Sequence, residues 1–235
     1  MKNLLHITLF FLVQVLYSQA TSGSIIYGIK PISFKIKEGV DVATRNMLEK
    51  SQAAAEKQTF VLEFNGSRSK FVMNDALLKD ASSEEAKFFN MIGAVRFTAD
   101  YSYFLDQKEN FELFKKNDGT IIKKDFHKIN WEISTESKTI DGYLCYKAVY
   151  NKEYIARDNK TKINRIVAWF APSLPYGFGP KEYNGTPGLI LELQEFDTIY
   201  YASSITILKD KELEIAFPKG KTVSQEDYTK KVLSN

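Results

Sequence analysis

Side chains that could carry chemistry are sparse in this chain of 235 residues. Of its two histidines, only His127 lies beyond the first 20 residues, and Cys145 is the single cysteine. A Cys/His metal cluster or a Ser–His–Asp triad would have to be built around one imidazole, so we predict no metal site and interpret His127 as a solvated residue at a strand end. Cys145 lies in an apolar run between Leu144 and Tyr146, which is typical of a buried, inert thiol.

Carboxylates are the other candidates for catalysis. Paired acids can hydrolyse glycosides or bind a hard cation, and a hydrolase hypothesis places such chemistry near Glu192, with Arg157 or Arg165 as an anion clamp. The simpler interpretation makes these acids surface or salt-bridged groups, so we assign no catalytic residue and expect no cofactor. The acids considered are Glu132, Glu136, Asp141, Glu192 and Glu195.

The N-terminus predicts export. Lys2 is followed by an apolar stretch over residues 4–16 that is too short to span a bilayer, as in a secretory signal peptide. We place the signal peptide at residues 1–20, preferring cleavage after Ala20 to cleavage after Ser18. Because no cysteine lies near this junction, the chain is not expected to be a lipoprotein. The remaining residues, 21–235, are expected to form a single β-rich domain without a transmembrane segment, located in the periplasm or secreted.

The charge distribution argues against nucleic-acid binding. The formal net charge is +3, and the lysines are scattered among glutamates and aspartates. Nucleic-acid recognition requires a concentrated basic stripe. We therefore expect no nucleic-acid partner.

Period-two alternation of apolar and polar residues dominates the chain and predicts half-buried strands. Asn65-Gly66 and Asn117–Gly119 are turn signals, and each is expected to join two strands in an antiparallel hairpin. About ten strands are predicted in total. They cover Ile32–Ile36, Phe60–Phe64, Ser69–Met73, Phe111–Phe114, Thr120–Phe126, Leu144–Tyr150, Ile163–Ala171, Leu189–Glu195, Ile199–Leu208 and Glu212–Phe217.

Helices are expected at few places. Residues 41–57 are rich in helix formers and predict a helix laid across the sheet. Ser82–Glu85 fits a capping box that opens a short helix, and Ser224–Asp227 could open another near the C-terminus.

The face pattern of the strands predicts a curled sheet. In the strand at 189–193, Leu189, Leu191 and Leu193 are expected on one face, with Ile190 and Glu192 on the other. Residues 165–170 are apolar on both faces, so the sheet must be covered twice or curled around something. Aromatic residues, 14% of the chain, can fill such a concavity. We predict a mainly β fold: one curled antiparallel sheet or open half-barrel, with one or two helices packed across it.

Residues 172–187 form the most distinctive segment, because they hold four of the chain's six prolines. Prolines that fix φ and glycines that release it indicate a shaped loop, which leads directly into the strand at 189–193. The loop is expected to be mainly architectural. In a functional interpretation its rim would face a cleft and contact a ligand or partner, through Trp169, Tyr176, Phe178, Lys181 and Tyr183.

The ordered run of unusual residues from 128 to 193 resembles the GLPGLI family of exported proteins from Bacteroidetes-type bacteria. The matching motifs include Trp131, the turn Ile140–Tyr143 and the namesake segment 185–190, in which Thr186 replaces the usual leucine. The resemblance implies secretion or periplasmic residence, a mostly antiparallel sheet and no established function. The motif positions interpreted as structural are Gly142, Cys145, Pro175, Gly179, Pro180, Gly185, Pro187, Gly188, Leu189 and Ile190.

These observations favour a non-catalytic exported binding or cell-envelope accessory protein. Strands apolar on both faces and the aromatic excess suggest a concave surface for a lipid-like small molecule, a peptide or an outer-membrane protein. Two alternatives remain: a periplasmic hydrolase using carboxylates near Glu192, and a structural subunit that displays the loop at residues 172–187 to a partner chain.

Overall fold

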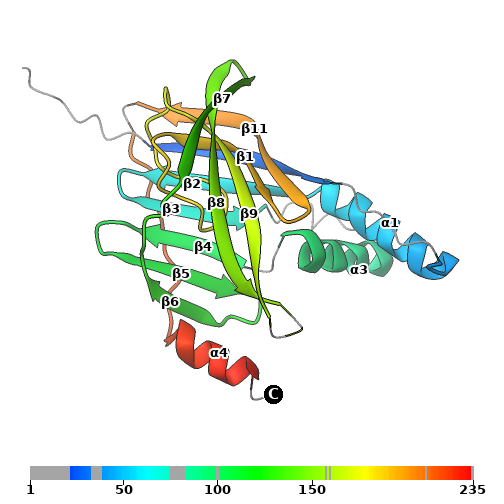
Figure 1. The fold of residues 1–235 in the computed structure, drawn as a ribbon. Coiled ribbons are helices and arrows are strands. Elements are labelled where there is room, and N and C mark those ends of the chain that lie inside the picture. The colour runs from blue at the N-terminus through cyan, green and yellow to red at the C-terminus, as the bar shows by residue number, and fades with distance from the viewer. Residues whose placement is uncertain are drawn as a thin grey trace, which may run out of the picture.

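A computed structural model describes residues 22–32, 39–74, 83–98, 101–156, 158, 160–209 and 211–233. Within these residues the chain forms one open sheet of twelve strands and three α-helices (Figure 1). The mainly β, single-sheet prediction is confirmed, although the sheet has twelve strands instead of about ten. The predicted signal peptide lies outside the described residues, as do residues 33–36 of one predicted strand and Arg157.

Strands and helices alternate only in the first half of the chain, and a long run of strands follows. In chain order the elements are β1 (Ser22–Pro31), α1 (Val42–Glu56), β2 (Thr59–Asn65), β3 (Arg68–Met73), α3 (Glu84–Gly93), a π-helical turn η1 (Ala94–Thr98), β4 (Tyr101–Asp106), β5 (Phe111–Lys116), β6 (Ile121–Asp125), β7 (Glu132–Ile140), β8 (Tyr143–Ile155), β9 (Thr161–Ala171), β10 (Leu189–Glu195), β11 (Thr198–Leu208), β12 (Thr222–Ser224) and α4 (Gln225–Leu233).

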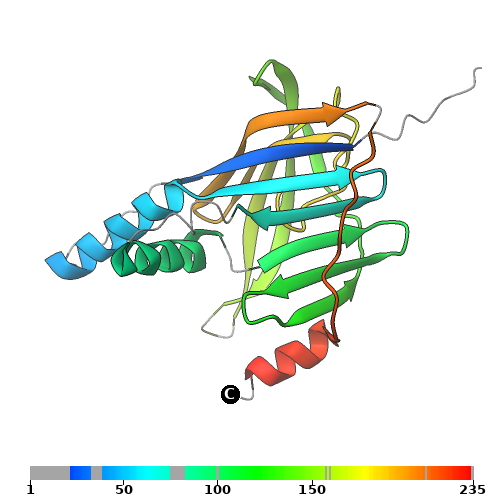
Figure 2. The same cartoon turned by 180° about the vertical axis from the view of Figure 1, so that it is seen from behind.

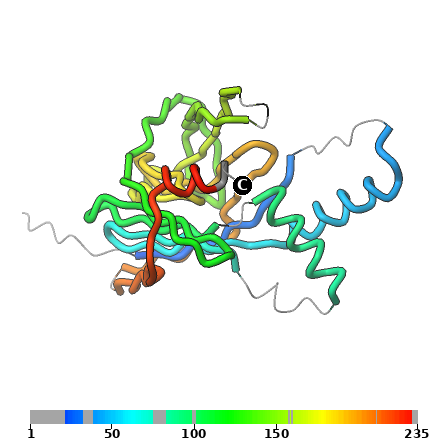
Figure 3. Tube along the Cα trace, turned by 90° about the horizontal axis from the view of Figure 1, so that it is seen from below, coloured from blue at the N-terminus to red at the C-terminus, as the bar shows by residue number. Residues whose placement is uncertain are grey.

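The sheet order is β12-β6-β5-β4-β3-β2-β1-β11-β10-β9-β8-β7. Neighbouring strands are antiparallel except for the short β12, which runs parallel to β6. The sheet curls, so that β8 and β9 pass in front of the wing formed by β2 to β6 (Figures 1 and 3). The two ends of the order, β12 and β7, do not pair with each other, and the result is a trough rather than a closed barrel.

Turn chemistry determines the hairpins. Asn65-Gly66 joins β2 to β3, and Asn117–Gly119 joins β5 to β6, as the sequence predicts. Between β7 and β8 the two turn residues Asp141 and Gly142 both have positive φ, 47° and 79°. A two-residue hairpin loop of this kind matches the twist of the flanking strands.

The helices do not lie across the sheet, and that part of the prediction is wrong. α1 and α3 pack against each other and project beyond the strand ends (Figures 1 and 2). Their contact is close because Gly93 of α3 meets the Ser51 carbonyl of α1, which a Cβ would approach to 2.7 Å. α1 buries only two side chains, those of Ser51 and Ala55, and so has no broad apolar face to lay on a sheet.

The segment after β11 is not a strand, although alternation predicts one at Glu212–Phe217. It crosses the outer face of the sheet (Figure 2). The Asn65 side-chain amide donates to the Leu213 carbonyl at 2.5 Å, and the Phe217 ring packs on Phe104 and Phe111 with centroids 5.7 and 5.8 Å apart. The apolar side chains therefore cover a second, smaller core on the outer face instead of adding to an edge.

A bulge in β10 corrects the predicted faces of that strand. Ile190 pairs with Phe170 and Leu193 pairs with Ala168, with the register shifting between Ile190 and Glu192. Paired residues share a face of a sheet, so Ile190 and Leu193 point to the same side. Alternation counted along the sequence misses the bulged residue and therefore assigns Ile190 to the wrong face.

Candidate functional site

The loop between β9 and β10, residues 172–188, lies inside the trough. The rings of Tyr176 and Phe178 pack against Phe64 of β2, with centroids 4.8 and 5.4 Å away. The loop is tied to β10, because the Leu189 and Ile190 amides donate to the carbonyls of Leu174 and Phe178 at 2.8 and 3.0 Å. Much of the concave apolar surface is therefore filled by the protein's own loop (Figure 3).

This placement shows where the five proposed contact residues lie. Phe178 and Tyr183 are buried, Tyr176 is half-buried, and Lys181 is enclosed in an ion pair, so these four face the interior of the trough. Trp169 lies apart from them on the outer face, where the Lys138 ammonium sits 4.4 Å from its ring centroid. Of the five, only Lys181 lines the cleft described below, and a contact of these residues with a ligand or partner stays a prediction.

Most motif positions lie in or beside the loop, but Gly142 lies in the exposed turn between β7 and β8. Gly179 lies against Ile190, and Gly188 against the backbone of Ala171. Leu189, Ile190 and Cys145 are fully buried, and Pro180 is buried, whereas Pro175 and Pro187 are exposed. Thr186 has a local function, because its hydroxyl donates to the Gly188 carbonyl at 2.6 Å. Gly185 and Gly142 both have positive φ, 88° and 79°.

A cleft of about 610 Å³ remains open at one end of the filled trough. One wall is mainly aromatic and apolar, with Arg96 and Lys124 also lining it, and it comes from η1 and the strands β4, β5 and β6. The opposite wall is charged, and it comes from β8, the loop and the end of β10. The residues that define the two walls are Phe97, Tyr101, Tyr103, Phe114 and Ile122 on the apolar side, and Lys152, Lys181, Glu182 and Glu195 on the charged side.

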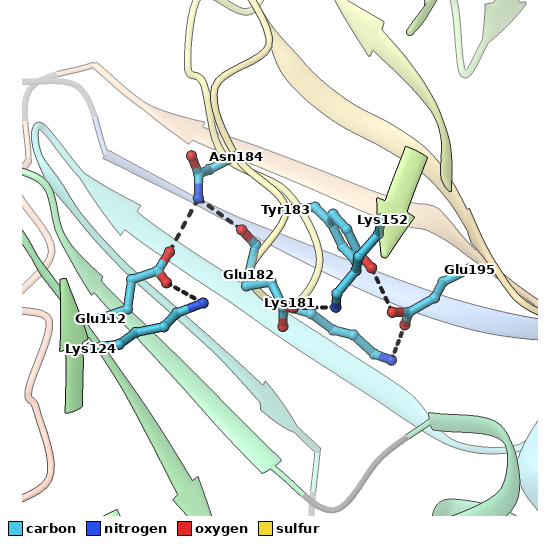
Figure 4. A network of polar contacts seen from close by, with 8 residues as sticks. All are labelled: Glu112, Lys124, Lys152, Lys181, Glu182, Tyr183, Asn184 and Glu195. Carbon is cyan, nitrogen blue, oxygen red and sulfur yellow. Dashed lines mark hydrogen bonds and ion pairs between the residues drawn. The ribbon is translucent and has the colours of Figure 1, made fainter. Parts of the chain in front are cut away.

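Four consecutive loop residues connect the charged wall to three strands (Figure 4). Lys181 pairs with Glu195 of β10, and Tyr183 donates its hydroxyl proton to the same carboxylate at 2.6 Å. Glu182 pairs with Lys152 of β8 at 2.7 Å. In addition, Asn184 donates to the Glu182 carbonyl at 2.8 Å. These contacts therefore tie the loop to β8 and β10.

The same network reaches β5 and β6 through Glu112. The Asn184 amide nitrogen lies 3.4 Å from the Glu112 carboxylate, which pairs with Lys124 at 2.9 Å (Figure 4). Burial raises the pKa of Glu112, although Lys124 opposes the shift. The polar contacts thus extend from one wing of the sheet to the other beneath the cleft.

The charges of the central pair are fixed over a wide pH range. Burial alone would raise the pKa of Glu195, but Lys181 and the hydrogen bonds from Lys181 and Tyr183 outweigh it and lower the pKa. Burial would lower the pKa of Lys181, yet the nearby oxygens of Tyr200 and Glu195 raise it. A general acid or base works best with a pKa near the operating pH. The Lys181–Glu195 pair is therefore suited to supply fixed charges rather than to shuttle a proton at neutral pH.

Two residues on the cleft adopt backbone conformations that L-residues avoid. Lys181 has φ 55°, and Phe196, in the turn between β10 and β11, has φ 48°. Bulky side chains at positive φ cost on the order of 1–2 kcal/mol, and such strain clusters at binding and catalytic sites. The Phe196 side chain is 53% exposed at the cleft.

The carboxylates of the hydrolase hypothesis lie outside this cleft, with one exception. Glu192 pairs with Lys138 at 2.8 Å, and Glu136 pairs with Lys147 at 2.8 Å. Because Glu192 is paired in register with Trp169, it shares the outer face of the sheet with that ring. Glu195 is the exception, and it is the acid that the sequence could not distinguish from the others.

Cys145 is predicted to be unreactive in the folded protein. Its side chain is fully buried, and burial raises the pKa of the thiol to about 11. We expect little maleimide labelling at pH 8 under native conditions and complete labelling in denaturant, measured by intact mass. Fast native labelling that does not follow global unfolding would contradict the buried assignment.

Sequence reasoning missed most of the lining residues. Lys152 and Glu182 belong to no recognisable motif. The sequence pattern around Phe97, Tyr103 and Phe114 is the same as that around ordinary core residues. The one local signal is the cluster of lysine, glutamate, tyrosine and asparagine at 181–184 between a proline and a glycine, because polar residues in an architectural loop need partners.

Comparisons with known proteins place the chain near a group of unestablished function. Residues 156–192 match a family model described as "Protein of unknown function (Porph_ging)". No curated protein matches the chain. Two solved structures of PNGF-II, in P21 and C2 space groups, have similar folds, with TM-scores of 0.54 and 0.52 and identities of 15% and 16%.

The likeness to PNGF-II covers 91% of this chain but only 33% and 32% of those chains, so this chain spans about a third of their length. At this identity the likeness is one of fold. No helix among the described residues has the length and apolar character needed to cross a membrane.

Proposed function

We propose that this chain is an exported, non-catalytic binding protein of the GLPGLI type, located in the periplasm or secreted, whose cleft holds a small amphipathic molecule. The observation that carries the proposal is the 610 Å³ cleft with an aromatic wall facing a charged wall. Small-molecule sites have volumes of about 300–1,000 Å³ and combine apolar surface with a few placed polar groups. The apolar body of the ligand lies on Tyr101 and Phe114, and its polar groups meet Lys152 and Glu182.

The two ion pairs of the charged wall differ in exposure. The side chains of Lys181 and Glu195 are 8% and 9% exposed, whereas those of Lys152 and Glu182 are 34% and 18% exposed. The first pair is part of the protein interior, while the second can exchange its partners with a ligand. The loop fills the rest of the concave surface, which favours a small molecule over a peptide or an outer-membrane protein laid along the trough.

The first experiment is native mass spectrometry of the mature protein purified from its own compartment. We expect an added mass of a few hundred daltons that is lost on denaturation. The retained molecule then serves as the titrant for the apoprotein. In the Trp169→Phe variant, Trp131 is the remaining tryptophan and reports on the loop, because its indole donates to the Asn184 carbonyl at 2.8 Å.

The decisive variant is Lys152→Met, with Lys138→Met as its matched control. Both lysines form half-exposed ion pairs with glutamates, at 2.7 and 2.8 Å, but only the first lies in the cleft. Losing a charged hydrogen bond costs about 1.5–3 kcal/mol, so we expect roughly tenfold or greater loss of affinity for Lys152→Met and none for Lys138→Met. Equal affinities for the two variants, or a protein that retains nothing and binds no amphipathic compound, would refute the proposal.

A further inference from the structure

A second cavity, of about 750 Å³, lies on the opposite, outer face of the sheet. Its floor is formed by Val72 of β3 and Phe104 of β4, one side by Met91 and Val95 of α3 and η1, and the other by Phe217 of the crossing segment. We call this cavity the outer groove. It runs between the projecting helices and the segment that crosses the back of the sheet (Figure 2).

The outer groove is lined by positive charge. Lys87 and Lys115 border it, together with Lys70, which pairs with Glu63 at 2.6 Å, and Lys116, whose ammonium donates to the Tyr228 hydroxyl at 2.6 Å. No aspartate or glutamate is among the described residues that line it. The register pairs Lys70 with Phe104, and Ser102 with Lys115, so cationic and apolar groups share one face. The Lys87 pair with Glu84 is a surface contact with side chains 57% and 90% exposed, and exposed pairs of this kind hold a charge weakly.

Exposed apolar side chains form a row along α3 and η1, on one side of the groove. Phe88, Met91 and Val95 are 45%, 55% and 66% exposed, and their spacing of three and four residues places them along one side of α3 and its π-helical continuation. Large apolar side chains gathered on a surface mark an interaction site more often than single ones do. Of these three, Met91 and Val95 line the groove, where they lie next to lysines beside the apolar floor.

We propose that the outer groove binds a free single-chain amphiphile with an anionic headgroup, of the fatty-acid type. The lysines attract the carboxylate, and the apolar chain lies over Val72 and Phe104 against Met91. Charge complementarity excludes a cationic amphiphile. The concave form and volume suit one molecule, whereas a membrane surface would require the apolar side chains to protrude. The groove lies on the outer face, whereas the cleft lies on the inner face and has both charges in its wall; Val95 and Tyr101 border both.

The test is calorimetric titration of the mature protein with dodecanoate, decanoate and dodecyltrimethylammonium below their micellar concentrations. We expect one dodecanoate site, about tenfold weaker binding of decanoate because two methylenes are lost, and no binding of the cation. Higher salt should weaken the binding of dodecanoate, because the lysines of the groove are exposed.

Two groove variants and two controls make the result specific. Ser102→Trp fills the groove and should abolish binding, and the Lys87→Glu/Lys115→Glu double variant, which changes exposed side chains, should weaken it at least tenfold. The distant charge reversal Lys160→Glu and the cleft variant Lys152→Met should leave the affinity unchanged. The proposal fails if the cation binds equally well, if Ser102→Trp binds normally, or if Lys152→Met removes the site. It also fails if the protein co-sediments with anionic phospholipid vesicles and the Ser102→Trp variant does so as well.

Discussion

Gly188→Ala should prevent folding or destabilise the protein by about 3 kcal/mol or more, near the upper end of overpacking effects. A Cβ at this position would lie 2.2 Å from the Ala171 carbonyl oxygen and 2.6 Å from its carbon. Both atoms are backbone, so no side chain can rotate away. The two ends of the loop come together here, where Leu189 pairs with Ala171, and this close approach requires a residue without a Cβ. The measurement is the free energy of unfolding in urea, or the soluble yield if the variant does not fold.

Gly142→Ala is the matched control. Gly142 has φ 79° in the turn between β7 and β8, but no heavy atom lies within 4 Å of its virtual Cβ. Alanine there meets only backbone strain, which costs on the order of 1–2 kcal/mol. If Gly188→Ala lowers the free energy of unfolding no more than Gly142→Ala does, the two ends of the loop approach each other less closely than described.

Local chemistry was sufficient to predict the hairpins. Asn65-Gly66 and Asp141-Gly142 are short turn sequences whose backbone preferences act within four residues, and both form turns in the structure. The N-terminal end of α1 was predictable for the same reason, because Asp41 accepts from the Thr44 amide and caps the helix. Such features need no knowledge of the rest of the fold.

Long-range features were not predictable from the alternation of residue types. The bulge in β10 changes the face of Ile190 without any change in composition, and the path of residues 211–221 over the outer face depends on an apolar patch built by β3 to β5. The inward direction of the loop at residues 172–188 depends on Phe64, more than a hundred residues away. The cleft was not predictable for the same reason, since its lining comes from eight separate segments of the chain that meet only after the sheet curls.

Glu195→Gln should lower the free energy of unfolding by about 3–5 kcal/mol, because it leaves the Lys181 ammonium buried without its counter-charge. Lys181→Met should cost a comparable amount by leaving the Glu195 carboxylate with Tyr183 as its remaining hydrogen-bond donor in Figure 4. The double variant Lys181→Met/Glu195→Gln removes both charges while the new amide can still accept from Tyr183. Its cost should therefore be smaller than the sum of the two single costs by about 2 kcal/mol or more.

The pH dependence gives an independent measure of the same pair. The pKa of Glu195 is lowered in the folded protein, so its contribution is fully present above its usual value near 4.5 and is lost as the pH falls through the folded pKa. The pKa of Lys181 is raised, so its contribution is present below its usual value of 10.5 and is lost as the pH rises through the folded pKa. The stability difference between wild type and the double variant should therefore be constant at neutral pH and shrink at acidic pH. A constant difference down to pH 2, together with additive single costs, would mean that the two charges are solvated independently and that the loop is held in the trough by its apolar contacts alone.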